Sequence, residues 1–228
     1  MRTFIHLILA MVSLPLVMAP RAMAQDAPDA ARYVVSYVEV APEKKDATAA
    51  LLRQLADDSR KDPGAVRIEV LQRTAPSNQF MILETWKDQQ ALDAHGAAAH
   101  TKQFHDKIAP MLIAPIDDRI LLPITVGPAQ SAPAALYVVT HVDVAPPNRD
   151  KIVAAFNTLA GPSRKDSGNL RFDFVQQTNR NNHFSMIEVW KDQASEDAHE
   201  LTAHTKEFRN AFNPLAGALY DQRSYKAL

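Results

Sequence analysis

A long internal repeat limits this chain to folds that can be built from two similar units. Tyr33-Val34-Val35 recurs as Tyr137-Val138-Val139, and one constant offset aligns further segments without a gap up to about Ala114. These segments are Val40-Ala41-Pro42, Ser59-Arg60-Lys61-Asp62, Trp86-Lys87-Asp88-Gln89, Asp93-Ala94-His95 and Ala99-His100-Thr101-Lys102. A solenoid repeat runs roughly 20–50 residues, so this longer unit matches a whole small domain. We therefore predict two domains of one fold, at residues 32–122 and 136–228.

The segments outside the repeat predict a leader and a linker. Residues 1–24 combine a positive start at Arg2, a mostly apolar stretch from Phe4 to Met18, and the small-x-small sequence Ala22-Met23-Ala24. This pattern is typical of a secretory signal peptide, so we expect a periplasmic or secreted protein. The alternative is an uncleaved membrane anchor, but the apolar run is shorter than the about 20 residues of a span. Residues 123–135 hold three prolines and no charge, which predicts a semi-rigid linker.

Composition excludes several classes of function. The formal net charge of the 228-residue chain is -1, so the sequence has no basic footprint for nucleic acid and no polybasic membrane patch. Once the signal peptide is removed, we expect no membrane association. The chain has no cysteine, which excludes disulfides, thiolate catalysis and zinc sites built on cysteine.

Each copy shows the same order of predicted elements. In the first copy the periodicities predict strands over residues 33–40, 66–73, 79–86 and 119–122, and helices over residues 46–59 and 88–107. Asp88 is the expected N-cap of the second helix. The order β-α-β-β-α-β is that of a ferredoxin-like α+β domain.

The strand at 79–86 is apolar on both faces. Phe80, Ile82 and Trp86 alternate with Met81 and Leu83, and successive strand side chains point to opposite faces. The second copy repeats this pattern. The helices of one domain can cover only one face of its sheet, so the other apolar face needs a second sheet. We therefore predict that the two copies pack sheet on sheet as an intramolecular pseudo-dimer.

A polar and aromatic pattern follows the end of this strand in both copies. It stands as Glu84-Thr85-Trp86-Lys87-Asp88, His95, His100 and Phe104, and again as Glu188-Val189-Trp190-Lys191-Asp192, His199, His204 and Phe208. The pattern resembles the antibiotic biosynthesis monooxygenase family, in particular its quinol-monooxygenase-like branch, whose fold is a dimeric α+β barrel. The resemblance implies a cavity between sheet and helices where O2 oxidises a small aromatic quinol or phenol, with no flavin, metal or haem. The protein would hold the ring, take a proton and stabilise an oxyanion.

Two carboxylates are candidates for catalysis. Glu84 shares the strand face of Phe80 and Trp86, and Glu188 occupies the matching position in the second copy. A carboxylate on an apolar face is costly unless it is paired or lines a wet cavity. Arg67 and Arg171 on the neighbouring strands are the candidate partners, and they are also candidates for substrate binding. A buried ion pair and a cavity-lining role both stay open.

Two pairs of histidines lie on the predicted second helices. His95 and His199 are the candidate bases for a phenolic proton, because neutral imidazole has a pKa near 6.5. The structural alternative is a histidine that bonds the neighbouring strand. His100 and His204 lie five residues further on, which is about 140° of rotation on one helix. That separation argues against a metal site of two helix histidines, so we expect no metal.

Aromatic side chains are the remaining candidates for substrate contact. Trp86 and Trp190 are expected either as core anchors or stacked on an aromatic substrate. Tyr37 and His141 occupy the same place in the two first strands, where they would either tune two unequal pockets or face solvent. The other candidates on the Trp86 face are Phe80 and Phe184.

Other functions are weighed against the monooxygenase hypothesis. Haem-degrading relatives of this fold carry an Asn on the first strand and a Trp on the second helix. In this chain the strand positions hold Ser36 and Thr140, and the Trp position falls near His95 and His199. These differences argue against haem. A non-catalytic binding or scavenging module is the main alternative, and a structural duplicate without ligand is the third. The sequence leaves open whether the whole chain pairs again as a homo-oligomer.

Overall fold

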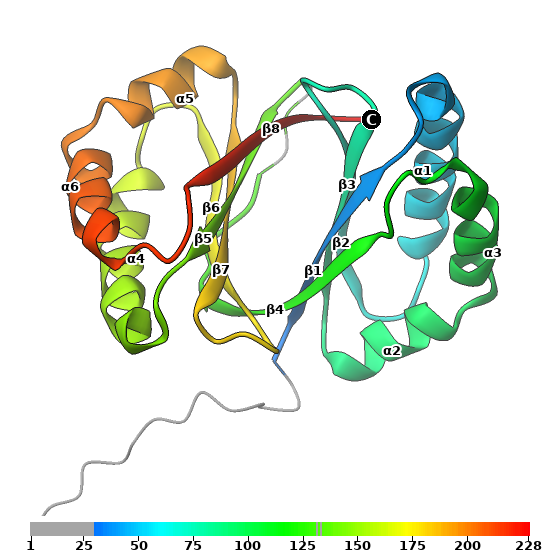
Figure 1. Ribbon diagram of the computed structural model, residues 1–228, viewed down its shortest axis with the longest axis horizontal. Coiled ribbons are helices and arrows are strands. Elements are labelled where there is room, and N and C mark those ends of the chain that lie inside the picture. The colour runs from blue at the N-terminus through cyan, green and yellow to red at the C-terminus, as the bar shows by residue number, and fades with distance from the viewer. Residues whose placement is uncertain (1–29, 131, 133) are drawn as a thin grey trace, which may run out of the picture.

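The repeat folds into two α+β halves with the same order of elements (Figure 1). A computed structural model describes residues 30–130, 132 and 134–228, and the predicted signal peptide lies outside the described residues. The first half contains β1(Arg32–Glu39), α1(Lys45–Ser59), β2(Ala65–Arg73), β3(Gln79–Trp86), α2(Gln89–Ala97), α3(Ala99–Ile108) and β4(Asp117–Thr125). The second half contains β5(Leu136–Asp143), α4(Arg149–Ser163), β6(Asn169–Gln177), β7(His183–Trp190), α5(Gln193–Glu200), α6(Ala203–Phe212) and β8(Asp221–Ala227). Short 3-10 helices lie at Pro42–Lys44, Ala109–Met111, Pro146–Asn148 and Asn213–Leu215.

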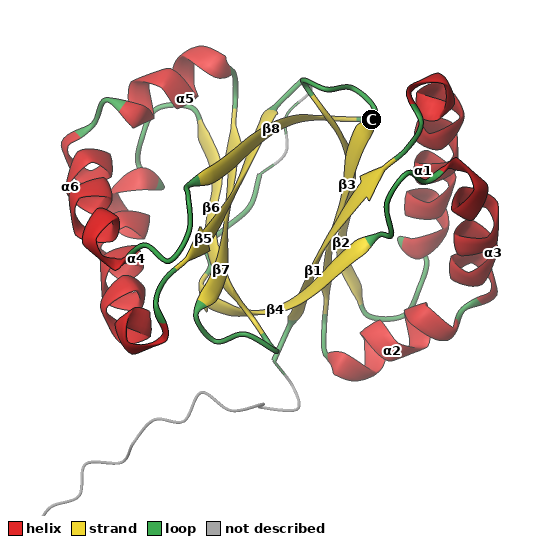
Figure 2. Cartoon of the chain, in the orientation of Figure 1, coloured by secondary structure: helices red, strands yellow, loops and turns green. Residues whose placement is uncertain are grey.

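The eight strands close into one barrel in the order β1-β3-β2-β8-β5-β7-β6-β4 (Figure 2). All neighbouring strands are antiparallel. The last strand of each half pairs with its own sheet and also with the other half: β4 joins β1 to β6, and β8 joins β5 to β2. The predicted pseudo-dimer is therefore confirmed, and its two sheets form one hydrogen-bonded barrel that has no open edge.

The linker begins later than the sequence predicts. We expected the fourth strand to end at Leu122, but β4 continues through Pro123 to Thr125. Pro123 pairs with Val175 of β6, and the register shifts between Pro123 and Thr125. Proline has no N–H to donate, so strands tolerate it at such irregularities. The first residues of the apparent linker are thus the end of a strand that closes the barrel.

The alternation predicted for β3 separates two kinds of core. Phe80, Ile82 and Trp86 pack under the helices, whereas Met81 and Leu83 lie in the core inside the barrel. The helices cover the outer face of the barrel on two opposite sides (Figure 1). Each large apolar side chain buried in this way stabilises the fold by about 1.5–3 kcal/mol. Among the described residues, no helix has the length and apolar character needed to cross a membrane.

The predicted second helix is two helices in each half. Ala98 has extended backbone (φ -64, ψ 148) between α2 and α3, and Thr202 does the same (φ -66, ψ 158) between α5 and α6. Asp88 caps the start of α2 as predicted, because its carboxylate accepts a hydrogen bond from the backbone N–H of Ala91. The break at Ala98 changes the direction of the chain. The rotation calculated for one continuous helix therefore does not describe the two histidines.

Candidate functional site

Four side chains of the first half form a buried polar array between the sheet and α2. Nδ1 of His95 lies 2.8 Å from Oδ2 of Asp62, and because a carboxylate only accepts, this nitrogen donates. Nε2 of His95 then lies 3.6 Å from Oε1 of Glu84. The indole N–H of Trp86 donates to Oε2 of Glu84 at 2.9 Å, and the indole stacks on the His95 ring at 4.5 Å. Asp62 thus sets the tautomer that leaves Nε2 as the basic nitrogen.

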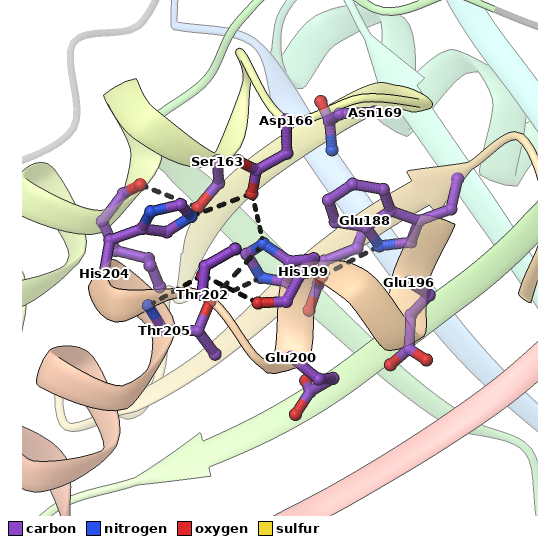
Figure 3. A network of polar contacts seen from close by, with 12 residues as sticks. Ser163, Asp166, Asn169, Glu188, Glu196, His199, Glu200, Thr202, His204 and Thr205 are labelled. Atoms are coloured by element: carbon purple, nitrogen blue, oxygen red, sulfur yellow. Dashed lines mark hydrogen bonds and ion pairs between the residues drawn. The ribbon is translucent and has the colours of Figure 1, made fainter. Parts of the chain in front are cut away.

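The second half repeats this array with closely similar distances (Figure 3). Nδ1 of His199 donates to Asp166 at 2.7 Å, and Nε2 lies 3.8 Å from Glu188. The indole N–H of Trp190 donates to Glu188 at 3.0 Å. His204 also donates to Asp166, at 2.8 Å from Nε2, so this carboxylate lies between two imidazole rings (Figure 3).

Sequence reasoning missed Asp62 and Asp166. Each lies in the turn after the first helix of its half, 33 residues before the histidine it contacts. The available signal was the repeated segment Ser59-Arg60-Lys61-Asp62, which is identical in the second copy.

A cavity of about 200 Å³ lies beside the first array, between the sheet and α1, α2 and α3. Its wall includes Glu84 and His95, so it exposes the two candidate catalytic groups. The other lining residues are mostly apolar: Val34, Ser36, Leu55, Ile82, Leu92, Gly96, Thr101, Phe104, His105, Ile116, Asp118 and Ile120. The structure therefore places a cavity where the family resemblance implies one, in the first half.

Larger and charged side chains occupy the matching region of the second half. Tyr220 stands where the first half has Ile116, and Glu200 stands where it has Gly96. Tyr220 packs against the buried core of this half, with the guanidinium of Arg209 over its ring at 5.8 Å. Arg209 forms an ion pair with Glu200, and Gln222 donates to Glu196 at 3.0 Å. The positions that match the first-half cavity wall therefore carry larger or charged side chains in the second half.

Burial controls the protonation of the array. It raises the pKa of Glu84 above its ordinary value, and the neighbouring His95 and the Trp86 N–H only partly offset this. Burial likewise raises the pKa of Glu188 to about 8. Desolvation lowers the pKa of His199, although the hydrogen bond to Asp166 acts in the opposite direction. Neutral imidazole beside a protonated carboxyl group is therefore the favoured state of the second array at neutral pH.

Arg67 and Arg171 do not pair with the glutamates, which corrects our prediction. Arg67 is opposite Thr85 in the ladder, and Glu84 is opposite Ile68, so the arginine lies on the other face of the sheet. Arg171 lies in the barrel interior, where it bonds Asp173 at 2.7 Å and Glu69 of the other half at 3.0 Å. The alternation of strand side chains explains the error, because the two residue types occupy opposite faces.

The aromatic candidates also lie away from the cavity wall. Trp86 and Phe80 are 0% and 1% exposed and belong to the core, and Trp190 and Phe184 are equally buried. The indole of each tryptophan donates a hydrogen bond to the glutamate of its array and packs against the histidine ring. Trp86 therefore helps to position Glu84 and His95. The remaining two candidates, Tyr37 and His141, face the barrel interior, on the opposite side of the sheet from the array.

The helix break brings together residues that we expected on different faces. The His95 and His100 rings lie 5.5 Å apart, and Nε2 of His100 is 3.2 Å from Asp62. Asp62, His95 and His100 therefore offer three donor atoms within 4.8 Å, and Asp166, His199 and His204 do the same. In both clusters the aspartate already accepts a hydrogen bond from the first histidine.

Both halves of the chain match the model of one known protein family. The family model "Antibiotic biosynthesis monooxygenase" matches residues 31–107 and again residues 135–211. The chain belongs to the antibiotic biosynthesis monooxygenase family. The two matches coincide with the two halves of the barrel, so this family member carries its domain twice.

Individual relatives give the range of activities found on this domain. The Bacillus subtilis protein "Putative monooxygenase YcnE" is 32% identical over 82 residues, which cover 36% of this chain and 86% of that protein. An isomerase of (4S)-4-hydroxy-5-phosphonooxypentane-2,3-dione from Klebsiella pneumoniae is 28% identical over 36% of this chain and 84% of its own length. A "Putative monooxygenase" structure from Fusobacterium nucleatum covers 87% of this chain and 93% of its own with a TM-score of 0.79. At 15% identity that structure is evidence for the fold alone.

Proposed function

We propose that the first half is the active one and that it is a monooxygenase for a small aromatic quinol or phenol. The observation that carries this proposal is the mostly apolar cavity of the first half, whose wall includes His95, a histidine oriented by Asp62. His95 would take the phenolic proton, and the electron-rich phenolate would then supply electrons to O2. One oxygen atom enters the ring, the other leaves as water, and the ring supplies the four electrons. A hydroquinone thus becomes a hydroxyquinone without an external reductant.

The protonation pattern supports this assignment of roles. Asp62 holds the proton of His95 Nδ1 at 2.8 Å, which orients Nε2 in the same way that a carboxylate orients a catalytic histidine in hydrolases. Burial raises the pKa of Glu84, so this carboxyl group can donate a hydrogen bond to a phenolate oxygen. A base and a hydrogen-bond donor on one wall suit a substrate that passes through an oxyanion.

The size of the cavity favours a substrate with a single ring. An apolar protein cavity of about 150 Å³ holds benzene, and the cavity here is about 200 Å³. A ring with two oxygen substituents fits this space, whereas a polyketide with several fused rings needs a larger one.

The charge of the cavity argues against the isomerase reaction. The substrate named for the Klebsiella pneumoniae relative carries a phosphonooxy group. Phosphate sites in proteins use arginine, lysine or helix N-termini. The lining of the first-half cavity includes Glu84 and Asp118 and no arginine or lysine. A dianionic substrate would therefore find no arginine or lysine to bind its phosphate there, and it would meet the Asp118 carboxylate.

Oxygen uptake with a panel of hydroquinones tests the proposal. We expect wild-type turnover at one O2 per quinol, with no oxygen returned by added catalase because no peroxide forms. His95→Ala should lower kcat/KM by about 10²–10⁴, the usual contribution of a general base. His199→Ala is the matched control, since it removes the same residue from the half whose cavity is filled, and it should keep the rate within about twofold.

Two outcomes would contradict this assignment. Full activity in His95→Ala removes the histidine from the mechanism. Saturable binding of the quinols without any oxygen uptake favours the alternative, a binding or scavenging module. The predicted signal peptide would place either protein in the periplasm or outside the cell, which fractionation with an antibody to the mature chain can test.

A further inference from the structure

We propose that His141, Asp143 and His183 form a binding site for one divalent transition-metal ion in the second half of the barrel. Asp143 and His183 are directly opposite each other on β5 and β7, and His141 lies two residues before Asp143 on the same strand. Residues two apart on a strand share a face, as do directly opposed residues. All three side chains therefore point to one place on the inner face of the barrel.

The three donor atoms converge without bonding to one another. Nε2 of His141 and Nδ1 of His183 lie 2.8 and 2.7 Å from Oδ1 of Asp143. Despite these short distances, Oδ1 of Asp143 has no hydrogen-bond partner among the described residues. Adjacent ligands of one tetrahedral zinc ion, each bound at about 2.0–2.2 Å, lie about 3.3–3.6 Å apart. The two imidazole nitrogens therefore need to move outward by only about half an ångström from Oδ1 to bind one ion together with it, and a cation would satisfy the buried carboxylate oxygen.

The first half provides a natural comparison because it keeps a carboxylate and lacks both histidines. The matching positions hold Tyr37, Glu39 and Gln79. Their side chains form an ordinary hydrogen-bonded group, in which Gln79 donates to Glu39 at 2.9 Å and accepts from Arg73. In the second half the position of Arg73 is taken by Gln177. The second half thus has two histidines and an aspartate at these positions, and it lacks the arginine that would repel a metal ion.

The surroundings favour a positive ligand with access to solvent. The cluster lines a cavity of about 440 Å³ together with Asp117, Asp118, Arg119 and Arg180. Three aspartates thus outnumber two arginines in its lining, and Arg119 is already bound to Asp117 at 2.6 Å. The three cluster side chains are 15–18% exposed. Water from the cavity can therefore complete the coordination.

The donor set indicates the class of metal. Imidazole nitrogen suits zinc, copper, nickel and iron, whereas calcium and magnesium take sets made of oxygen alone. Two imidazoles and one carboxylate with open positions are known from zinc sites that keep bound water. Zinc is thus the appropriate probe.

Calorimetric titration of the chelator-treated full-length protein with ZnCl2 at pH 7.5 tests the site. We expect one ion per chain. His183→Gln, which installs the first-half residue, should weaken binding by at least about tenfold. His100→Gln and His204→Gln are the matched controls, since each removes a histidine from one of the two clusters between sheet and helices, and both should keep wild-type affinity.

The competing outcomes are distinct. The absence of a binding heat in wild type overturns the proposal. So does binding that His183→Gln leaves intact and that His100→Gln or His204→Gln abolishes, because the ion then lies at the helix clusters. If His183→Gln does not fold by circular dichroism, anomalous diffraction from zinc-soaked wild-type crystals decides. A zinc peak between Asp143 and His183 supports the site, and saturating zinc without a peak there overturns it.

Discussion

At the scale of single residues, the candidate site depends on carboxyl groups held in an apolar core. Glu84 and Glu188 occupy strand positions whose neighbours on the same face are aromatic and aliphatic. Each has an indole N–H as its main hydrogen-bond donor. One such bond does not replace the hydration that an ionised carboxylate loses on burial. The protein therefore keeps these groups at a cost in stability that depends on pH.

Glu188→Gln should stabilise the protein at neutral and mildly alkaline pH. The pKa of Glu188 is raised from 4.5 to about 8 in the folded state, so the folded state binds more protons than the unfolded state between these values. Wild-type stability then falls as pH rises from about 5 to 8. Glutamine keeps the acceptor for Trp190 without the charge, so we expect a gain of roughly 1–3 kcal/mol at pH 8 and almost none at pH 4.

Urea unfolding of wild type and Glu188→Gln across this pH range measures the difference. Comparing the two proteins at each pH cancels the titration of the groups they share. A difference that does not change between pH 4 and 8 would show that the pKa of Glu188 is the same in the folded and unfolded protein, which contradicts the prediction.

Residue identity was easier to predict from sequence than residue partnership. The repeat and the alternation on β3 were enough to select Glu84 and His95. They could not select Asp62, because that contact depends on how the turn after α1 folds against α2. The sequence pattern places Arg67 on the strand next to Glu84 and so predicts that the two pair. The ladder register, which shifts between Ala65 and Arg67, shows that they lie on opposite faces of the sheet.

At the scale of elements, two boundaries differ from the prediction for identifiable reasons. Ala98 interrupts the second helix although alanine is the best helix former, so tertiary packing of α3 overrides local propensity there. Pro123 continues β4 although proline usually ends a strand, since the neighbouring register shift accommodates its missing N–H. For Pro123 the deciding contact comes from β6 of the other half, and no local pattern reports it.

The turn that starts β2 should be sensitive to one added methyl group. Gly64 has φ +87, and a Cβ there would lie 2.5 Å from Cβ of Ala91 at the start of α2. Gly64→Ala combines a left-handed backbone with a clash, and we expect it to lower the free energy of unfolding by roughly 1–3 kcal/mol. The same clash should displace α2, which carries His95.

Gly161→Ala is the control for the change of glycine to alanine. Gly161 lies within α4, and an added Cβ meets nothing within 4 Å. We expect this variant to change the free energy of unfolding by less than about 1 kcal/mol, because the restriction of the unfolded chain by alanine is opposed by the crowding of a helical residue before Pro162. Thermal unfolding of both variants measures the effects, and equal shifts in the same direction would show that the backbone conformation at Gly64 is not required.

At the scale of the whole molecule, duplication lets the two halves keep one barrel while their sites diverge. The first half has a mostly apolar cavity, and the matching region of the second half holds Tyr220 and the Arg209–Glu200 ion pair. The cluster of His141, Asp143 and His183 has no counterpart in the first half. A barrel made from two identical chains could not assign different tasks to its halves in this way, because every substitution would appear twice.

The contact between the halves inside the barrel should depend on one of two matched arginines. Arg171 is 2% exposed and bonds Asp173 and Glu69, and Glu69 also accepts from the Tyr137 hydroxyl at 3.0 Å. Arg171→Ala leaves the buried Asp173 carboxylate without its cation, and it leaves Glu69 with Arg67 alone, at 3.6 Å. We expect a loss of about 3–5 kcal/mol, typical of removing one partner from a buried ion pair.

Arg67→Ala provides the matched control, because Arg67 occupies the same repeat position as Arg171. Its side chain is 28% exposed and lies 3.6 Å from Glu69, so water screens the pair and we expect a loss below about 1 kcal/mol. Urea unfolding at pH 7 measures both variants. The difference follows from the asymmetry of the barrel: β6 presents its arginine to Glu69 across the junction of the halves, whereas β2 leaves its own near the surface. If Arg171→Ala lowers the free energy of unfolding as little as Arg67→Ala does, the junction between the halves does not depend on Arg171.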